Sequence, residues 1–198
     1  MAVNIVDHKD FLATINGLLL DSRSVLDIGC GIGSTLRGFC CPIRIGIDVH
    51  RPYLERAKED GQYVLLNLPA ERLSEVLLAK SVDSVTLIDV IEHFEKKVGY
   101  EVLRQAEKIA NRKVIIFTPR GYFKQKEFDH YGLGGEKYQR HRSGWEIEDF
   151  EQLGYNITLF KGFHDAENAA FREAYGEDAQ PIDAILAWKV CTPEEQSL

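Results

Sequence analysis

Short apolar runs alternate with amphipathic stretches along most of the chain. Runs rich in β-branched residues predict buried strands at residues 24–28, 41–49, 62–66, 82–88 and 113–117. Between them, apolar residues spaced three and four apart predict helices at residues 8–20, 34–39, 53–60, 69–80 and 96–111. Strands that alternate with helices in this way predict an α/β protein, with a doubly wound parallel sheet covered by helices on both faces.

The pattern changes after residue 118. Residues 119–144 are rich in glycine, aromatic and basic residues without a sustained period, and so long an irregular segment is usually functional. We predict that it forms a lid or an acceptor-binding insertion. Apolar runs at residues 155–160 and 182–190 predict two last strands, and the lack of a good crossover helix between them favours an antiparallel pair at one sheet edge.

A last core helix is predicted at residues 145–153, between the irregular segment and these strands. Trp145 at its start is expected in the core, with Ser143 as the helix N-cap and Glu146 completing a capping box. At 198 residues the chain has room for one domain with a substantial core, so residues 1–198 are expected to form a single domain.

The composition of the chain limits which kinds of binding partner are expected. The formal net charge of -7 provides no general attraction to phosphate backbones, so no nucleic-acid partner is expected. No apolar run approaches about 20 residues, which argues against a membrane span. The cysteines lack the spacing of a zinc site and are expected to be reduced thiols of a cytoplasmic protein; they are Cys30, Cys40, Cys41 and Cys191. We expect a monomer or homodimer that acts on a small molecule.

The stretch S-V-L-D-I-G-C-G-I-G at residues 24–33 holds the most specific motif. A dinucleotide site requires glycine where this chain has Ser34, whereas Asp27 and the three glycines complete the pattern D-x-G-x-G-x-G. A carboxylate at the end of the strand repels a pyrophosphate, but it suits a ligand that carries an ammonium and a sulfonium. The motif therefore favours S-adenosylmethionine over NAD.

Polar residues also end the next strands. Asp48 is suited to accept both hydroxyl protons of a ribose, whichever nucleotide is bound. Asn67 is placed to pair with an adenine edge, and Asp89 is expected beside the cofactor pocket. The simpler interpretation is that each residue caps a helix.

Three segments together resemble the class I S-adenosylmethionine-dependent methyltransferases: V-L-D-I-G-C-G-I-G, I-G-I-D-V and D-V-I-E-H-F. The resemblance covers about residues 20–160 and points to the small-molecule branch, which includes quinone-biosynthesis enzymes. It implies a Rossmann-like sheet of seven strands in the order 3-2-1-4-5-7-6, with strand 7 antiparallel. The cofactor-binding residues that it implies are Asp27, Gly29, Cys30, Gly31, Gly33, Asp48, Val49, Asn67, Leu68 and Asp89. The family often has aspartate at the position of Asn67.

Methyl transfer from a sulfonium releases a neutral thioether, so the leaving group needs no acid. Holding nucleophile, methyl and sulfur in line supplies most of the acceleration. An oxygen or nitrogen nucleophile also needs a base, and the catalytic candidates are Glu92, His93 and His141, with His130 as a further histidine of the irregular segment.

The resemblance leaves the use of a metal open. Asp89, Glu92 and His93 resemble the metal-binding pattern of ubiquinone-type O-methyltransferases, in which a divalent ion orients the acceptor. The same pattern occurs in relatives that need no metal, and no metal is the leading expectation.

The acceptor side is expected in the irregular segment. Its aromatic residues Tyr122, Phe123, Tyr131 and Tyr138 would wall a pocket. Gln139 and His141 would provide polar contacts, and Arg140 or Arg142 would meet an anionic group of the acceptor. One alternative is an NAD-dependent sugar-nucleotide epimerase or dehydrogenase, whose Y-x-x-x-K pair would be Tyr122 and Lys126. The other is a partner subunit that binds the cofactor without catalysing a reaction.

Overall fold

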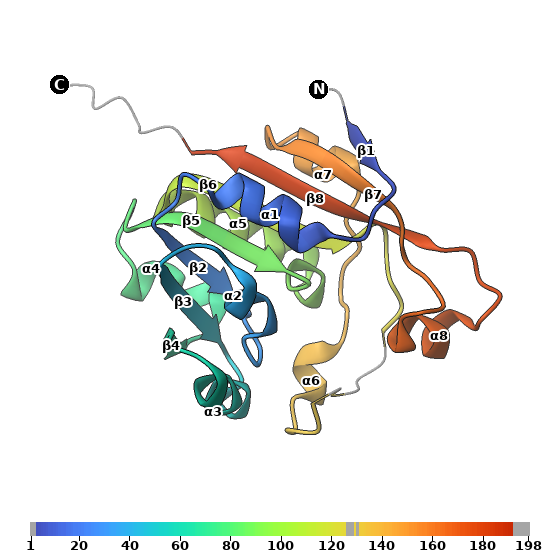
Figure 1. The fold of residues 1–198 in the computed structure, drawn as a ribbon, viewed down its shortest axis with the longest axis horizontal. Coiled ribbons are helices and arrows are strands. Elements are labelled where there is room, and N and C mark those ends of the chain that lie inside the picture. Colours follow the sequence, from blue (N-terminus) through green and yellow to red (C-terminus); the bar gives the residue numbers. More distant parts are fainter. Residues whose placement is uncertain (1–2, 126–128, 130, 192–198) are drawn as a thin grey trace.

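The computed structural model describes residues 3–125, 129 and 131–191. Within them, one sheet of eight strands runs through the centre of the molecule in the order β1-β7-β8-β6-β5-β2-β3-β4 (Figure 1). The strands are β1 (Asn4–Val6), β2 (Ser24–Ile28), β3 (Ile43–Asp48), β4 (Val64–Asn67), β5 (Val82–Ile88), β6 (Ala110–Pro119), β7 (Asn156–His164) and β8 (Ile182–Val190). Strand β8 is antiparallel to both β6 and β7, and the other neighbouring pairs are parallel.

The predicted order is confirmed, with one additional strand. Read from β4 without β1, the sheet has the order 3-2-1-4-5-7-6 with its seventh strand antiparallel. The predicted count of seven was one short, because β1 pairs in parallel with β7 at the edge, Asn4 opposite Thr158. Three residues are too few to show a period of two, so the sequence pattern gives no signal for this strand.

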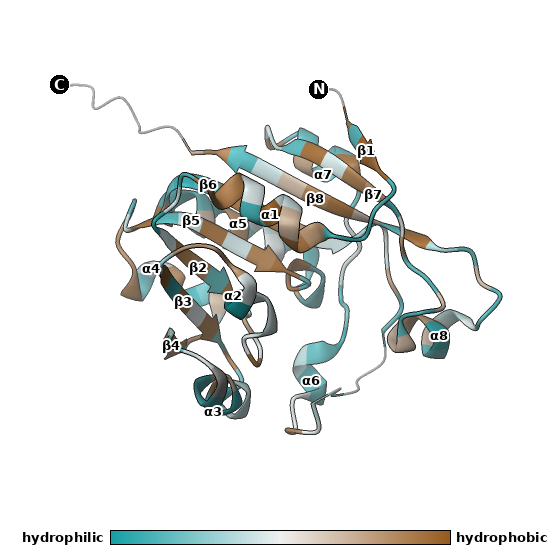
Figure 2. Cartoon of the chain, in the orientation of Figure 1, coloured by the Kyte–Doolittle hydropathy of each residue, from teal (hydrophilic) through white to brown (hydrophobic). Residues whose placement is uncertain are grey.

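Alternating residues of the central strands fill two separate apolar cores. On β6, Val114 and Ile116 pack into one core, whereas Ile115 and Phe117 pack into the other. Because neighbouring side chains of a strand point to opposite faces, this alternation buries both faces of the sheet. Figure 2 shows the result as apolar colour on the central strands, while α3 and α6 are mainly hydrophilic.

Helices cover both faces. On one face lie α1 (Phe11–Leu19), α2 (Ser34–Gly38) and α3 (Arg51–Asp60), and on the other α4 (Leu73–Val76), α5 (Lys96–Ile109) and α7 (Ile147–Glu151). In Figure 1, α1 lies in front of the sheet and α5 behind it. The remaining elements are two further helices, α6 (Glu136–Gln139) and α8 (Ala169–Tyr175), and two 3-10 turns, η1 (Ala70–Arg72) and η2 (Ile91–His93). In the part of the chain described, no helix combines the length and apolar character needed to span a bilayer.

The helix predicted at residues 69–80 is much shorter in the structure. It is reduced to η1 and the four residues of α4, and the chain turns at Lys80, whose φ is +57°. The Lys80 ammonium donates a hydrogen bond to the carbonyl of Ala110, 3.0 Å away, which holds this turn against the start of β6. Tertiary contacts therefore override the helical spacing of the apolar residues here.

The cap of α7 differs from the prediction. The N-cap is Glu146, in a reciprocal capping box with Asp149, and not Ser143. The Ser143 hydroxyl instead accepts a hydrogen bond of 3.0 Å from the indole N–H of Trp145. Trp145 is fully buried, as predicted, and its buried N–H requires a partner, which Ser143 provides.

Candidate active site

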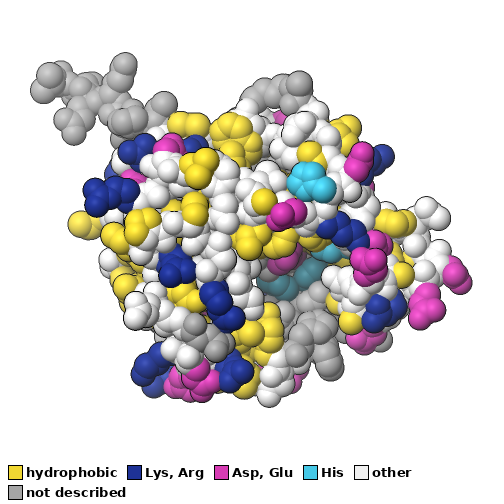
Figure 3. Space-filling view, in the orientation of Figure 1, with side chains coloured by type: hydrophobic (Ala, Val, Ile, Leu, Met, Phe, Trp, Pro, Cys, Tyr) yellow, Lys and Arg dark blue, Asp and Glu magenta, His cyan; other side chains and the backbone are white. Residues whose placement is uncertain are grey.

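A cavity of about 770 Å³ opens at the carboxyl ends of β2, β3 and β5. Parallel α/β sheets bind ligands at this edge, where the strand order reverses between β2 and β5. The space-filling view shows this face hollowed, with histidine and acidic side chains gathered in the hollow (Figure 3). The volume lies within the range of small-molecule sites.

The loop at residues 29–33, which we call the glycine loop, crosses the mouth of the cavity. Gly29 has φ +69°, and a Cβ there would stand 2.6 Å from a methyl carbon of Val90. At Gly31 a Cβ would meet no atom within 4 Å, and this residue lines the cavity. The loop thus turns tightly against the protein at Gly29 and offers bare backbone to a ligand at Gly31.

Asp27 lies beneath this loop, one residue before the end of β2. Its carboxylate is 2% exposed and accepts a hydrogen bond of 2.7 Å from the hydroxyl of Thr86 on β5. Burial raises the pKa of Asp27 to about 7, with the Thr86 hydrogen bond opposing this rise and the negative charge of Asp48 adding to it. A buried acid on the cavity wall whose partner Thr86 is neutral is suited to bind a cation.

Asp48 ends β3 and holds two backbone N–H groups. Its two carboxylate oxygens accept hydrogen bonds from the N–H of Gly31, at 2.9 Å, and of His50, at 2.7 Å. The side chain of Asn67 does not line the cavity, because its amide nitrogen donates to the carbonyl oxygens of Asp48 and Val49. Asn67 therefore fixes the turn after β3, while Asp48 faces the cavity.

Of the other residues expected around the cofactor, most line the cavity and one does not. Cys30, Val49, Leu68 and Asp89 line the cavity together with the glycine loop. Gly33 does not line it, but begins α2 with φ +77°. Burial raises the pKa of the Cys30 thiol, which makes it a neutral wall rather than a nucleophile.

Asp89 follows β5 and has a strained backbone. Its φ is +51°, which is uncommon for a residue with a side chain, and its N–H donates to the carbonyl of Phe117 at 2.8 Å. This conformation places Asp89 on the cavity wall, where burial raises the pKa of its carboxyl group.

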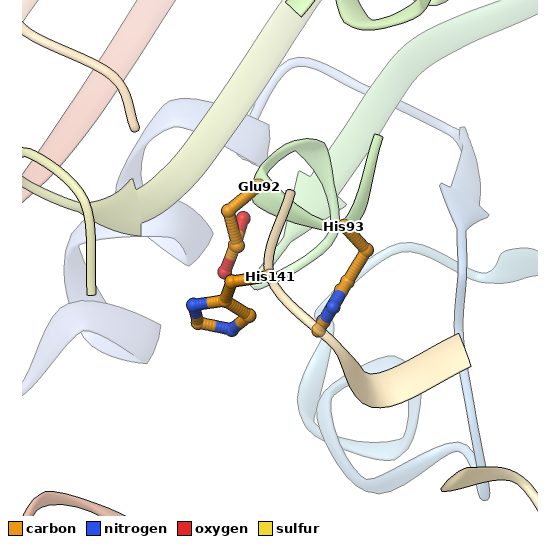
Figure 4. A group of neighbouring side chains, drawn as sticks. All are labelled: Glu92, His93 and His141. Atoms are coloured by element: carbon orange, nitrogen blue, oxygen red, sulfur yellow. The ribbon is translucent and has the colours of Figure 1, made fainter. Parts of the chain in front are cut away.

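The three catalytic candidates meet at one point of the same cavity. Glu92, His93 and His141 each offer one candidate ligand atom, and these atoms lie within 4.8 Å of one another (Figure 4). Glu92 and His93 come from η2, whereas His141 comes from the loop after α6. Asp89 does not belong to this cluster within the described residues; His141 takes the third place.

Backbone carbonyls orient both imidazole rings. The Nδ1 of His141 lies 2.8 Å from the carbonyl of Phe123, and the Nδ1 of His93 lies 3.2 Å from the carbonyl of Arg140. A carbonyl only accepts, so each Nδ1 carries the proton and each Nε2 carries the lone pair. Burial lowers the pKa of His93 to about 4 and that of His141 to about 3, which keeps both rings neutral at neutral pH.

Glu92 is almost completely buried beside these rings. One carboxylate oxygen accepts a hydrogen bond of 2.9 Å from the hydroxyl of Thr118, and the other, Oε1, is buried and has no partner among the described residues. Burial raises the pKa of Glu92, and the neighbouring Asp89 carboxylate adds to the rise.

Described residues of the segment 119–144 form much of the opposite wall, and Asp129 organises them. The Asp129 carboxylate accepts a hydrogen bond of 2.7 Å from the hydroxyl of Tyr53 on α3. It also accepts backbone N–H groups from Tyr131 at 2.9 Å, Leu133 at 2.6 Å and Gly135 at 3.1 Å. Burial alone would raise the pKa of Asp129, but these four donors lower it to about 2.

Some predicted acceptor residues line the cavity and others do not. The lining includes Phe123, Tyr131, Tyr138, Gln139, His141 and Arg142. Tyr122 is outside it and 58% exposed, and the Arg142 guanidinium donates to the carbonyls of His93 and Lys137. His130 and Lys126 lie outside the described residues, so neither prediction is tested.

Some polar residues of the wall were not named by the sequence analysis, among them His164 and Asn168. His164, at the end of β7, is 6% exposed, and no described residue forms a hydrogen bond with its Nε2. Asn168, before α8, also lines the cavity. His164 carries no motif, and it lies four residues beyond the predicted strand at residues 155–160, because β7 continues to His164.

Comparisons with known proteins agree with this geometry. The family described as "Methyltransferase domain" matches residues 26–117. Among curated protein sequences, none matches the chain. The YcgJ protein from Bacillus subtilis is similar in structure, with a TM-score of 0.62, 15% identity and coverage of 94% of this chain and 100% of that chain.

Two further similar structures contain SAH, the demethylated product of S-adenosylmethionine. They are magnesium protoporphyrin IX methyltransferase from Synechocystis PCC 6803, with a TM-score of 0.57, and the plantazolicin methyltransferase BamL, with 0.60. Each is 16% identical to this chain, and each match covers 93% of this chain and 84% of the other protein's chain. The matched domain, the strand order and the glycine loop followed by Asp48 agree on one conclusion: residues 26–117 match the methyltransferase-domain family, and the chain has the fold of the class I S-adenosylmethionine-dependent methyltransferases.

Proposed function

We propose that this protein transfers the methyl group of S-adenosylmethionine to an oxygen, nitrogen or carbon atom of a small-molecule acceptor. The observation that carries the proposal is the buried carboxylate of Asp27 on the cavity wall, below a glycine loop that leaves its backbone bare. An anion here attracts an ammonium and a sulfonium and repels a pyrophosphate.

The cofactor half of the cavity is assigned on this basis. Asp27 would bind the ammonium of the methionine moiety, and Gly29, Cys30, Gly31 and Gly33 shape the loop beside it. Binding of a cation would lower the pKa of Asp27 and keep it ionised.

The nucleoside would lie along the next strands. Asp48 would accept the ribose hydroxyls with lone pairs that its two N–H donors leave free. Val49 and Leu68 would contact the adenine ring, and Asn67 would support this wall through the backbone of Asp48 and Val49. Asp89 would border the methyl donor from the end of β5.

The acceptor would occupy the side built by the segment at residues 119–144. Aromatic walls from Phe123, Tyr131 and Tyr138 suit a flat or cyclic molecule, and Gln139 and His164 add polar contacts. This segment acts as the acceptor wall and lid of the single domain. Its tie to α3 through Asp129 and Tyr53 joins the acceptor wall to the cofactor half of the cavity.

Catalysis would depend mainly on alignment in this enclosed cavity. Where the acceptor atom carries a proton, the neutral His93 or His141 offers a lone pair on Nε2 to receive it. The carboxyl group of Glu92 lies beside both rings. The methyl group moves from sulfur to the acceptor, and the bonding pair stays on sulfur, so no acid is needed for the leaving group.

Isothermal titration tests the cofactor. We expect S-adenosylmethionine and SAH to bind, Asp27→Ala to weaken both by at least about tenfold, and NAD not to bind. Binding of NAD alone would overturn the proposal in favour of a dehydrogenase or epimerase. Incubation of a metabolite extract with methyl-labelled S-adenosylmethionine, followed by mass spectrometry, then tests turnover. Tight binding without any labelled product would favour a non-catalytic partner subunit.

A further inference from the structure

The cluster of Glu92, His93 and His141 has the composition of a metal site. It offers one carboxylate and two imidazoles, and both ligand types bind divalent first-row ions. Their candidate ligand atoms lie within 4.8 Å of one another, close enough for the three side chains to hold one ion between them. Figure 4 shows the Glu92 carboxylate extending toward the ring of His141, with the ring of His93 beside it.

The hydrogen bonds around the cluster orient its ligands. The Nδ1–H groups of His93 and His141 donate to the carbonyls of Arg140 and Phe123, which leaves the Nε2 lone pairs for a ligand. Metal-bound histidines commonly donate their second N–H in this way, because it holds the ring orientation and tautomer. The two rings stand 4.8 Å apart, inclined by 71°, and do not stack.

An independent observation is the orphaned oxygen of Glu92. The residue is 2% exposed, Thr118 occupies one carboxylate oxygen, and Oε1 is buried without a partner in the part of the chain that the structure describes. A buried polar atom without a partner costs about 1–3 kcal/mol, and such an exception needs an explanation. A cation held with the two imidazoles would satisfy it.

We propose that Glu92, His93 and His141 bind one divalent first-row cation, such as Mn²⁺, Fe²⁺ or Zn²⁺, which orients an acceptor hydroxyl for methylation. This inference rests on the proposed function, and it narrows the acceptor atom to oxygen. Two imidazoles argue against a site dedicated to Ca²⁺ or Mg²⁺, which prefer oxygen ligands.

Three protein ligands leave coordination positions for the acceptor, and the chemistry that such an ion supplies is a lower hydroxyl pKa and a fixed orientation. In the overall reaction the hydroxyl proton passes to water, a C–O bond forms, and the S–C bond breaks with its electron pair on sulfur. The products are a methyl ether, SAH and a proton. Because His93 and His141 serve as ligands in this arrangement, neither acts as the base.

Manganese titration of the chelator-treated full chain, followed by electron paramagnetic resonance of free Mn²⁺, tests the site without relying on activity. We expect one ion per chain. His93→Asn and His141→Asn keep a nitrogen donor near the Nδ1 position and remove only the Nε2 ligand, and each should weaken binding by about tenfold or more. Glu92→Gln should do the same.

His164→Asn is the matched control, because it removes another histidine of the same cavity and should leave Mn²⁺ binding unchanged. Circular dichroism of each variant checks its fold. Undiminished binding in all three cluster variants, or none in the unmodified chain, would overturn the inference.

SAH titration in the presence of chelator separates the two proposals. SAH binding without Mn²⁺ binding would leave the methyltransferase proposal intact and reject the metal site. Mn²⁺ binding that the cluster variants abolish, without SAH binding, would uphold the metal site and reject the cofactor assignment. Zn²⁺ binding in competition with Mn²⁺ would further support a shared site for first-row ions.

Discussion

Thr86 and Asp27 are register partners on the neighbouring strands β5 and β2, and the Thr86 hydroxyl donates a hydrogen bond of 2.7 Å to the Asp27 carboxylate. Both side chains are buried at the centre of the sheet. The hydrogen bond favours the charged form of Asp27, whereas burial favours the neutral form. Thr86 therefore controls how readily Asp27 carries a charge at neutral pH.

Substitution Thr86→Val should weaken S-adenosylmethionine binding at pH 7 by about tenfold, because a hydrogen bond to a charged group contributes about 1.5–3 kcal/mol. Without this donor the pKa of Asp27 rises further, so the loss should shrink as the pH is raised to 9. Isothermal titration between pH 6 and pH 9 measures both effects. Thr86→Ser keeps the hydroxyl and should bind S-adenosylmethionine nearly as tightly as the unmodified chain does. If Thr86→Val binds as tightly as the unmodified chain at every pH, the role of Thr86 is contradicted.

Ionisation of the buried Asp27 should lower the unfolding free energy of the ligand-free protein as the pH rises. Its pKa in the fold, about 7, lies above its ordinary value of 3.8, so the folded chain holds the proton more tightly. This contribution to stability is fully present below about pH 4 and is lost as the pH rises through 7. Asp27→Asn removes the titration, and its gain in unfolding free energy should grow by about 1–2 kcal/mol from pH 6 to pH 8.

Urea unfolding of both chains at the two pH values, without ligand, measures this difference. The same variant should bind S-adenosylmethionine at least about tenfold more weakly, which would make Asp27 a residue that trades stability for binding. A stability difference that is constant between pH 6 and pH 8 would show that Asp27 stays ionised throughout this range.

The sequence pattern predicts the sheet well because the strands are buried on both faces. Runs such as residues 82–88 and 113–117 are rich in apolar and β-branched residues, and a polar residue follows each, so their existence and order follow from the pattern and the motifs. The three residues of β1 have no such pattern, since only their pairing with β7 makes them a strand.

The site was predictable where it depends on strand ends and not where it depends on distant contacts. Asp27 and Asp48 reach the cavity because parallel strands bring their carboxyl ends to one edge. His93 and His141 lie close together although 47 residues separate them in the sequence, and no local spacing predicts such a contact. Asn67 ends a predicted strand, as Asp48 does, but the hydrogen bonds from its side-chain amide to backbone carbonyls turn it away from the cavity wall.

Two glycines of the glycine loop should respond differently to the same substitution. Gly29→Ala combines a positive φ with a Cβ 2.6 Å from Val90, and should cost about 2–4 kcal/mol of unfolding free energy. Gly31→Ala meets no atom, so it should cost only about 1–2 kcal/mol but weaken S-adenosylmethionine binding by filling the cavity. Unfolding and titration together separate the effects, and Val90→Ala should restore part of the stability lost in Gly29→Ala.

Tyr53→Phe should loosen the acceptor wall. It removes the hydroxyl that joins α3 to Asp129 at 2.7 Å and leaves the three backbone donors of Asp129 in place. We expect a loss of about 1.5–3 kcal/mol in unfolding free energy and faster proteolysis near residues 129–135. Tyr63→Phe, at a tyrosine that contacts Arg44 through its ring, is the control and should change neither; unchanged proteolysis in the Tyr53 variant would show that other contacts hold the wall.

Gly99 and Gly17 give a last test, on the packing of α5 against Trp145. An alanine in a helix is normally about 0.5–1 kcal/mol more stable than glycine, and Gly17→Ala on α1 should show this gain because its Cβ meets no atom within 4 Å. A Cβ at Gly99 would instead stand 2.6 Å from the Trp145 ring, which cannot retreat: it stacks on Phe150 at 5.3 Å and lies 3.8 Å from the Lys96 ammonium. Gly99→Ala should therefore lose about 1–3 kcal/mol despite its better helix propensity. Thermal unfolding resolves the two, since 1 kcal/mol corresponds to about 2–4 °C in a chain of this size, and a stabilised Gly99 variant would show that the indole has room to move.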